Sequence, residues 1–271
     1  MLTLFTIPKP FAGAVSGIQE TAIESWRRLD DDIQIVLLGD ERGVADAAVT
    51  HGVEHVPSIS RGASGTPLVD GAFAAVDAVA RFELRCFTNA DIVFDQTLLA
   101  AARAIASAAP RFLIVGQTRD VEPALAQADP EARRRLALEH GRLRGAAALD
   151  WFVFTCGLFD PIPPFHVGRA GYDNWLVWRA RQRAVVVDAT AAVLSIHQSH
   201  DYEHVEGGKD GAYYGPEAAR NLELAGGKHA IFTLHDASHK MASDLSVRRN
   251  PGAVLRAGER VRKLKWKLGC R

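Results

Sequence analysis

The sequence predicts an α/β protein whose mainly parallel sheet carries helices on both faces. The 271 residues are 48% hydrophobic and 24% charged, which are the proportions of an ordinary globular protein. Short apolar runs alternate with stretches of helical periodicity through the first half of the chain, which is the pattern of successive β-α units. A chain of this length also buries enough apolar surface to fold without a metal or a disulfide.

The first half, residues 1–117, is expected to alternate strands and helices. Apolar runs predict strands at 2–6, 33–38, 53–56, 84–88 and 112–115. Helical periodicity predicts helices at 17–29, from 44 onward, at 67–81 and at 97–108. Ile18, Ala22 and Trp26 recur on one face of the first of these helices. Thr66-Pro67 has the form of an N-cap followed by proline at the first helical position.

The second half, residues 118–247, is less regular and completes a single domain with the first. Its expected elements are strands at 151–155, 184–187 and 193–197, a helix at 173–182, a charged helical stretch at 121–145, a proline-rich turn at 161–165 and a loop at 201–230. A basic tail, residues 248–271, follows, and a helix is expected over 252–268.

Charge and cysteine usage exclude several classes of protein. Lys+Arg and Asp+Glu are both 32, so no general attraction to nucleic acid is indicated. Cys86, Cys156 and Cys270 are widely spaced, which excludes a CxxC zinc site and favours a reducing compartment such as the cytoplasm. No apolar run of about 18 residues and no basic N-terminal flank occur, so neither a membrane span nor a signal peptide is expected. Dinucleotide, P-loop and GxSxG hydrolase motifs are missing from the sequence.

The first candidate site lies in Thr88-Asn89-Ala90-Asp91, at the end of a predicted strand. Ligands of open α/β sheets sit beyond the carboxyl ends of the strands. A carboxylate at this point is placed to hold a hard divalent cation against a diphosphate. The alternative is that Asp91 only caps the next turn.

A second candidate lies in Gly171-Tyr172-Asp173-Asn174-Trp175, where a helix is expected to begin. Asp173 is either a capping residue or a general base that takes a proton from an attacking hydroxyl. Trp175 and Trp178 lie three residues apart, and one exposed indole would suit stacking on a sugar, although tryptophan is more often a core residue.

Histidines and strand-end loops supply the remaining candidates. His197 and His200 follow a strand, next to Asp201, and this pattern fits either a metal site or a structural hydrogen-bond network. The loops after the first two strands contain Thr6, Pro8, Lys9 and Asp40, and the next loop contains Arg61. Pro8 and Asp40 are placed to contact a nucleotide base, and Lys9 and Arg61 are placed to contact phosphate.

Taken in order, these motifs resemble a GT-A-type glycosyltransferase of the family-2-like group over about residues 1–200. Asn89-Ala90-Asp91 corresponds to the Asp-x-Asp metal motif, with Asn in place of the first Asp. The resemblance implies that 1–117 is a nucleotide-binding half and 118–247 an acceptor half. The residues it implies for nucleotide or sugar contact are Thr6, Pro8, Lys9, Asp40, Arg61, Asn89 and Trp175. It implies Asp91 and His197, with His200 as the alternative, as metal ligands, and Asp173 as the catalytic base.

The resemblance further implies an inverting, Mn²⁺- or Mg²⁺-assisted transfer of a sugar from a nucleotide-diphosphate donor to a hydroxyl of a glycan or lipid-linked glycan. The tail carries a net charge of +8, because it contains nine basic residues and one acidic residue, Glu259. It is either a solvated terminus or a peripheral contact with the inner face of a membrane. Three other functions stay open: a non-catalytic nucleotide- or sugar-binding protein, a metal-dependent hydrolase built on His197, His200 and Asp201, and, least favoured, a nucleotidyltransferase.

Overall fold

A nine-stranded sheet runs through the centre of the computed structural model, which describes residues 2–200 and 207–257. Its strand order is β13 (Val247–Arg249), β12 (His239–Met241), β10 (Val185–Asp188), β6 (Phe112–Val115), β9 (Trp151–Thr155), β4 (Leu84–Thr88), β1 (Thr3–Thr6), β2 (Gln34–Leu38), β3 (Glu54–Val56). Five of the eight neighbouring pairs are parallel; β9 runs antiparallel to both β4 and β6, and β13 to β12. The predicted mainly parallel sheet is therefore confirmed.

The reversed strand β9 determines which loops share an edge of the sheet. Thr88, the last residue of β4, pairs with Trp151, the first residue of β9. The start of β9 therefore lies at the same edge as the ends of the parallel strands. Residues just before 151 join the strand-end loops, although they precede their strand.

A second sheet of four short strands lies beside the ends of the first. Its order is β5 (Ile92–Phe94), β11 (Ser195–Gln198), β7 (Arg119–Val121), β8 (Arg142–Leu143). Only β11 was expected. The other three strands are two or three residues long, too short to produce a periodic pattern.

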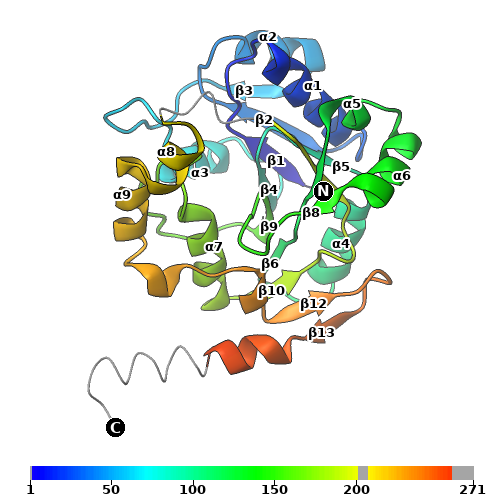
Figure 1. The fold of residues 1–271 in the computed structure, drawn as a ribbon, viewed down its shortest axis with the longest axis vertical. Helices are drawn as coiled ribbons and strands as arrows, with labels where there is room; N and C mark the ends of the chain where they lie inside the picture. Colours follow the sequence, from blue (N-terminus) through cyan, green and yellow to red (C-terminus); the bar gives the residue numbers. More distant parts are fainter. Residues whose placement is uncertain (1, 201–206, 258–271) are drawn as a thin grey trace.

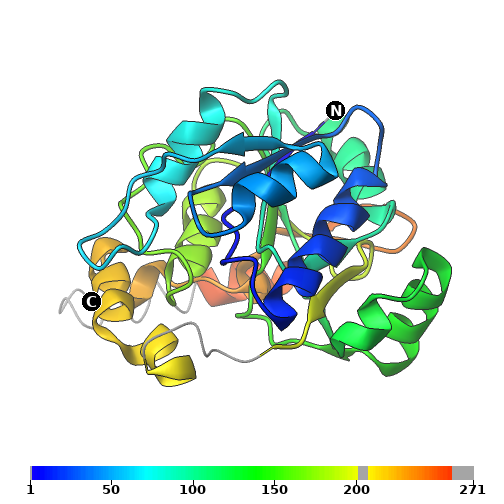
Figure 2. The same ribbon diagram turned by 90° about the horizontal axis from the view of Figure 1, so that it is seen from above.

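Helices cover both faces of the large sheet, as Figures 1 and 2 show. One face carries α1 (Ala14–Arg27), α2 (Val44–His51) and α4 (Thr97–Ala106), and the other carries α3 (Val69–Asp77) and α7 (Tyr172–Arg181). The remaining helices are α5 (Pro123–Ala126), α6 (Pro130–His140), α8 (Gly208–Tyr214), α9 (Pro216–Leu224) and the 3₁₀ turns η1 (Lys228–Ala230) and η2 (Leu234–Asp236). Each face has its own apolar core, so the sheet separates two hydrophobic clusters.

Two buried tryptophans connect the sheets and helices. Nε1 of Trp26, on α1, donates to the carbonyl of Ile92 on β5 at 2.8 Å. Nε1 of Trp151, on β9, donates to Oγ of Ser195 on β11 at 3.0 Å. Both indoles are fully buried, so these bonds combine large apolar burial with a satisfied polar group.

Several expected boundaries were wrong. Thr66 does not cap α3, because Pro67 bridges to Arg61 and Leu68 to His166 before the helix begins at Val69. The stretch expected to be loop, 201–230, contains α8 and α9 within its described part. The structure also adds β12 and β13, so the first residues of the basic tail belong to the sheet.

The helix expected at 252–268 is present over 251–257, and Val254 and Leu255 on it are each 71% exposed. The predicted remainder of that helix lies outside the described residues. Among the described residues, no helix is both long enough and apolar enough to cross a membrane.

Candidate functional site

The predicted site residues gather at the edge of the large sheet where its parallel strands end. Thr6 ends β1, Asp40 follows β2, and Asn89 and Asp91 follow β4. Asp150, just before the reversed strand β9, reaches the same edge. This edge is where open α/β sheets bind their ligands.

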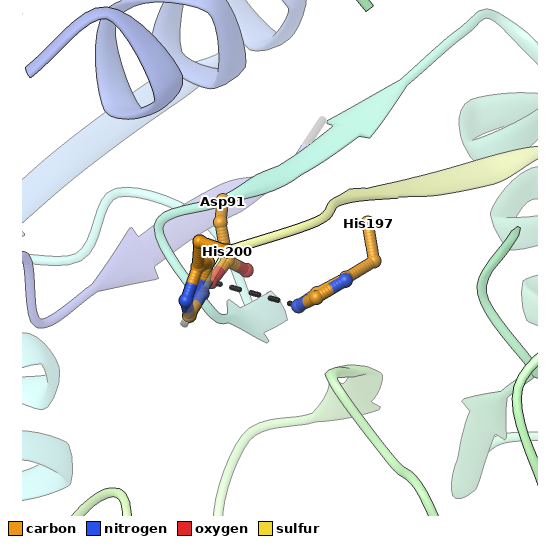
Figure 3. Close-up of side chains that lie close together, drawn as sticks. All are labelled: Asp91, His197 and His200. Atoms are coloured by element: carbon orange, nitrogen blue, oxygen red, sulfur yellow. Dashed lines mark hydrogen bonds and ion pairs between the residues drawn. The ribbon is translucent and has the colours of Figure 1, made fainter. Parts of the chain in front are cut away.

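Asp91, His197 and His200 form one cluster (Figure 3). The antiparallel pairing of β5 with β11 sets His197 opposite Ile92, one residue after Asp91. Nε2 of His200 lies 2.8 Å from Oδ2 of Asp91, and Nε2 of His197 lies 3.9 Å from the same oxygen. The three ligand atoms all lie within 4.8 Å of one another. His197 and His200 were expected as alternatives, and the structure brings both to the carboxylate.

The electrostatics of this cluster favour an ionised carboxylate. Burial raises the pKa of Asp91, but His197, the hydrogen bond with His200 and the ammonium of Lys9 outweigh it and hold the pKa well below its usual range. Oδ1 of Asp91 is buried and has no hydrogen-bond partner among the described residues. An ionised oxygen left without a partner and two imidazole nitrogens fit a divalent cation.

Two further side chains surround the cluster. Asp120, on β7, accepts a hydrogen bond from Nδ1 of His197 at 2.8 Å, which leaves the other ring nitrogen to face Asp91. Nζ of Lys9 lies 3.2 Å from Nε2 of His200. Lys9, expected near phosphate, therefore contributes a positive charge directly beside the cluster.

Asn89 belongs to a second polar network, centred on the buried Asp150. The amide nitrogen of Asn89 donates to Oδ1 of Asp150 at 3.2 Å. The other carboxylate oxygen accepts from Thr118 and from Arg144, each at 2.8 Å. Nε of Arg144 lies 3.6 Å from Asp120, so the two networks are continuous.

Asp173 lies in the first turn of α7 and is half-buried. Burial, together with the negative charge of Asp150, raises the pKa of Asp173 to about 7, although hydrogen bonds from the backbone at Asn174 and Gly171 oppose the rise. A carboxylate with a pKa near neutrality is suited to accept a proton during a reaction.

A cleft of about 290 Å³ opens next to Asp120. Its lining residues are Asp120, Arg142, Leu143, Arg144, Gly145, Ala148, Lys209 and Tyr213. The loop that forms one wall is held to α7, because Nδ2 of Asn174 donates to the carbonyl of Ala147 at 3.4 Å. The cleft wall therefore includes Asp120, which contacts His197, and a loop that is hydrogen-bonded to the helix that carries Asp173.

The expected nucleotide contacts lie farther along the same edge. Nη2 of Arg61 is 2.5 Å from Asp40, and Nη1 is 3.0 Å from Glu41. Arg61 holds the pKa of the exposed Asp40 below its usual range. Thr6 and Pro8 are buried, and the hydroxyl of Thr6 has no hydrogen-bond partner among the described residues. Asp40 and Arg61, predicted to contact different parts of a nucleotide, are thus paired with each other.

The prediction for Trp175 was wrong. Its side chain is 4% exposed and packs against Phe165, with ring centroids 5.2 Å apart, in the core beneath α7. An indole buried in this way offers no face to a sugar. Trp178 is half-buried and contacts His229. Asp201, part of the alternative hydrolase site, lies outside the described residues.

Asp120, Arg144 and Asp150 were missed in the sequence. Asp120 and Arg144 lie on or beside strands too short to recognise, and Asp150 precedes a strand whose reversed direction the sequence does not reveal. The only available signal was the polar residue directly before the apolar run 151–155.

The sequence matches no known family model and no characterised protein sequence. Solved structures do resemble the fold. Glucosyl-3-phosphoglycerate synthase from Mycobacterium tuberculosis, in complex with Mn²⁺, UDP-glucose and phosphoglyceric acid, superposes with a TM-score of 0.52 at 14% identity, covering 84% of this chain and 80% of that one. Residues 1–349 of S. aureus TarS give a TM-score of 0.47 at 12% identity and cover 71% of this chain.

The chain spans 59% of that TarS fragment. At these identities the likeness is one of fold. The predicted GT-A-like fold, a large mostly parallel sheet with helices on both faces, is confirmed by the synthase structures.

Proposed function

We propose that this chain is a glycosyltransferase that moves a sugar from a nucleotide-diphosphate donor to a hydroxyl group of an acceptor. The observation that carries the proposal is the Asp91, His197 and His200 cluster at the end of β4, in a GT-A-like fold. The M. tuberculosis synthase of this fold was solved with Mn²⁺ and UDP-glucose. A site that can hold a cation at the sheet edge is what a diphosphate leaving group requires.

The donor would lie along the strand ends, with its base towards Thr6, Pro8 and Asp40 and its phosphates towards the Asp91 cluster. Lys9 and Arg61 supply positive charge on this path. Arg61 is already neutralised by Asp40 and Glu41, so its proposed role is to orient Asp40 as well as to meet phosphate. Asn89 would contribute a hydrogen bond, without charge, through its amide oxygen.

Asp91, His197 and His200 would hold the cation, which supplies charge to stabilise the departing diphosphate. Asp120 keeps His197 in the tautomer that a ligand needs. Asp173 would accept the proton of the acceptor hydroxyl as that oxygen attacks the anomeric carbon from the face opposite the diphosphate, with inversion. General-base assistance of this kind contributes about 10²–10⁴-fold to the rate.

The acceptor half of the domain would bind a glycan or a lipid-linked glycan, and the basic tail would support contact with an anionic membrane surface on the cytoplasmic side. Exposed Val254 and Leu255 beside Arg256 suit such a surface. Co-sedimentation with anionic liposomes is expected for the full chain and not for a chain ending at residue 249. Equal co-sedimentation would remove the membrane contact from the proposal.

Calorimetric titration with nucleoside diphosphates tests the donor and metal assignments. Binding is expected to tighten at least tenfold in 1 mM Mn²⁺, and Asp91→Asn is expected to abolish this gain because it removes the charge without changing side-chain size. Asp46→Asn, on the exposed face of α2, is the matched control. An affinity that is independent of Mn²⁺ in the parent chain would contradict the metal role.

The same preparation separates transfer from simple binding. A transferase releases UDP from a UDP-sugar, slowly when the sugar is transferred to water and faster when it is transferred to an acceptor. Tight nucleotide binding without any release would favour the non-catalytic alternative, which Asn89 in the metal motif also suggests.

A further inference from the structure

Two cationic side chains, Arg142 and Lys209, line the cleft beside the Asp91 cluster, and among the described residues its wall contains a single carboxylate. Arg142, on β8, is 86% exposed, and its guanidinium lies 3.6 Å from Oδ2 of Asp120. Lys209, on α8, is exposed and makes no ion pair within the described part of the chain. A third cation in the wall, Arg144, is bound to Asp150. The wall contains one carboxylate, that of Asp120, and it is shared with His197.

The geometry of α8 directs two groups into the same cleft. Lys209 and Tyr213 are four residues apart, so they lie on one face of the helix, and both line the cleft. The backbone fixes this helix against the start of α7, because the amide of Ala170 donates to the carbonyl of Ala212 at 3.0 Å. Arg142 on β8 and Lys209 on α8 therefore place two positive charges in the same cleft.

We propose that this cleft binds the acceptor through an anionic group, a carboxylate or a phosphate, held between Arg142 and Lys209. This inference rests on the proposed transfer reaction and specifies the chemistry of its acceptor. A guanidinium offers paired N–H donors that match either anion, and the ammonium adds a point charge. The cleft wall is bonded to α7 through Asn174 and Ala147, so the proposal requires that a hydroxyl of the bound molecule extend towards Asp173 at the start of that helix.

The two cations give the cleft a preference for anions over neutral molecules. A neutral polyol could accept hydrogen bonds from the two cations but would bring no charge to offset the water that it displaces from them. An anion replaces the weak 3.6 Å contact of Arg142 with a direct charge-assisted hydrogen bond. The cleft is thus suited to select charged acceptors over uncharged ones.

Ligand-observed NMR titration with three small probes tests this proposal, in the presence of saturating UDP and Mn²⁺. Glycerate presents a carboxylate, glycerol 3-phosphate presents a phosphate, and glycerol is the uncharged counterpart of both. At least one anion is expected to bind at least about tenfold more tightly than glycerol, and the better of the two identifies the group. Equal binding of all three, or binding of none up to 20 mM, would overturn the proposal.

Variants locate the effect. Arg142→Gln/Lys209→Gln is expected to weaken anion binding about tenfold or more and to leave UDP affinity unchanged. Lys240→Gln/Arg248→Gln, which removes two exposed charges from β12 and β13 at the sheet edge, is the control and is expected to change neither. A parallel loss of UDP affinity would assign these cations to the donor and refute the acceptor site. Anion binding that persists in a chain with no nucleotide affinity would refute the proposed function alone.

Discussion

The raised pKa of Asp173 links the stability of the fold to the role proposed for this residue as a base. Its pKa of about 7 lies above the unfolded value near 4, so the folded state loses stability as the pH rises from about 4 through 7. At pH 8 the half-buried carboxylate is ionised near Asp150, which costs free energy of folding. The ionised form is also the one that can accept a proton, so the cost appears in the pH range where the base would work.

Asp173→Asn is therefore expected to have opposite effects on stability and activity. Transfer should fall by about 10²-fold or more, because the amide cannot act as a base. The free energy of unfolding at pH 8 should rise by roughly 1–3 kcal/mol, and at pH 4, where the carboxyl is protonated in the folded state and about half protonated in the unfolded state, it should be nearly unchanged. Urea unfolding at the two pH values and kcat/KM between pH 5.5 and 8.5 check this. In the parent chain kcat/KM should climb with pH through about 7.

A different pattern would remove the base assignment. The base would have to be another group if Asp173→Asn kept near-parental turnover. The same would follow if kcat/KM of the parent chain were constant from pH 6 to 8. Asp46→Asn, which changes an exposed carboxylate on α2, should alter neither measurement.

Asn89 is explained by its neighbour. Its amide donates to the buried carboxylate of Asp150 at 3.2 Å, and an Asp at position 89 would bring two carboxylates to that distance. Asn89→Asp is therefore expected to destabilise the fold at pH 7 by roughly 1–3 kcal/mol and to give no gain in Mn²⁺ affinity.

The double variant Asn89→Asp/Asp150→Asn restores a hydrogen bond between the two positions and moves the carboxylate from position 150 to position 89. It should recover most of the lost stability in urea unfolding and bind Mn²⁺ more tightly than the parent in calorimetry. If Asn89→Asp alone is as stable as the parent at pH 7, the contact with Asp150 does not explain the missing aspartate.

At the scale of elements, the site depends on how the two sheets are joined. Asp91 precedes β5 and His197 lies on β11, both in the small sheet, whereas Asn89 and Asp150 belong to the large one. The hydrogen bond from Trp151 to Ser195 crosses between them. The relative position of the proposed metal ligands and the proposed acceptor cleft thus depends on a buried contact outside both.

Trp151→Phe is expected to loosen the small sheet before the large one. Loss of the hydrogen bond and of part of the ring should cost about 2–4 kcal/mol. In hydrogen exchange, the amides of β5, β7 and β11 should lose protection more than those of β1 and β2, and Mn²⁺ affinity should fall. Trp178→Phe, a change to a half-buried indole on α7, is the control and should leave the small sheet protected. Uniform loss of protection across both sheets would contradict this division.

Across the whole molecule, the sequence predicted elements with strong local patterns and missed those that depend on distant partners. The strands β1, β2, β4, β6 and β9 are apolar runs bounded by polar residues, and they were located within one residue. By contrast β7 is a strand through its pairing with β11 and β8, and β8 through its pairing with β7. No periodicity within two or three residues records such pairing.

The candidate site divides in the same way. Asp91 follows the strand β4, Asp173 lies at the start of α7 and His197 lies on β11; all three elements were predicted, so sequence position was enough to select these residues. Asp120 and Asp150 were hidden because a short strand and a reversed strand bring them to the edge. Trp175 was misjudged because helical spacing gives the face of a residue and not what covers that face.

The reversal of β9 has a consequence for how such a molecule can change over time. Residues 116–150 depart from the end of β6 and re-enter at the start of its antiparallel neighbour, so the two ends of this excursion lie side by side. It carries Asp120, Arg142 and Arg144 together. Insertions, deletions or wholesale exchange here would leave the register of the nine strands untouched. Variation between Asp120 and Asp150 could therefore change the cleft wall at Arg142 and Arg144, and with it the proposed acceptor, provided that Asp120 and Asp150 keep their contacts with His197 and Asn89.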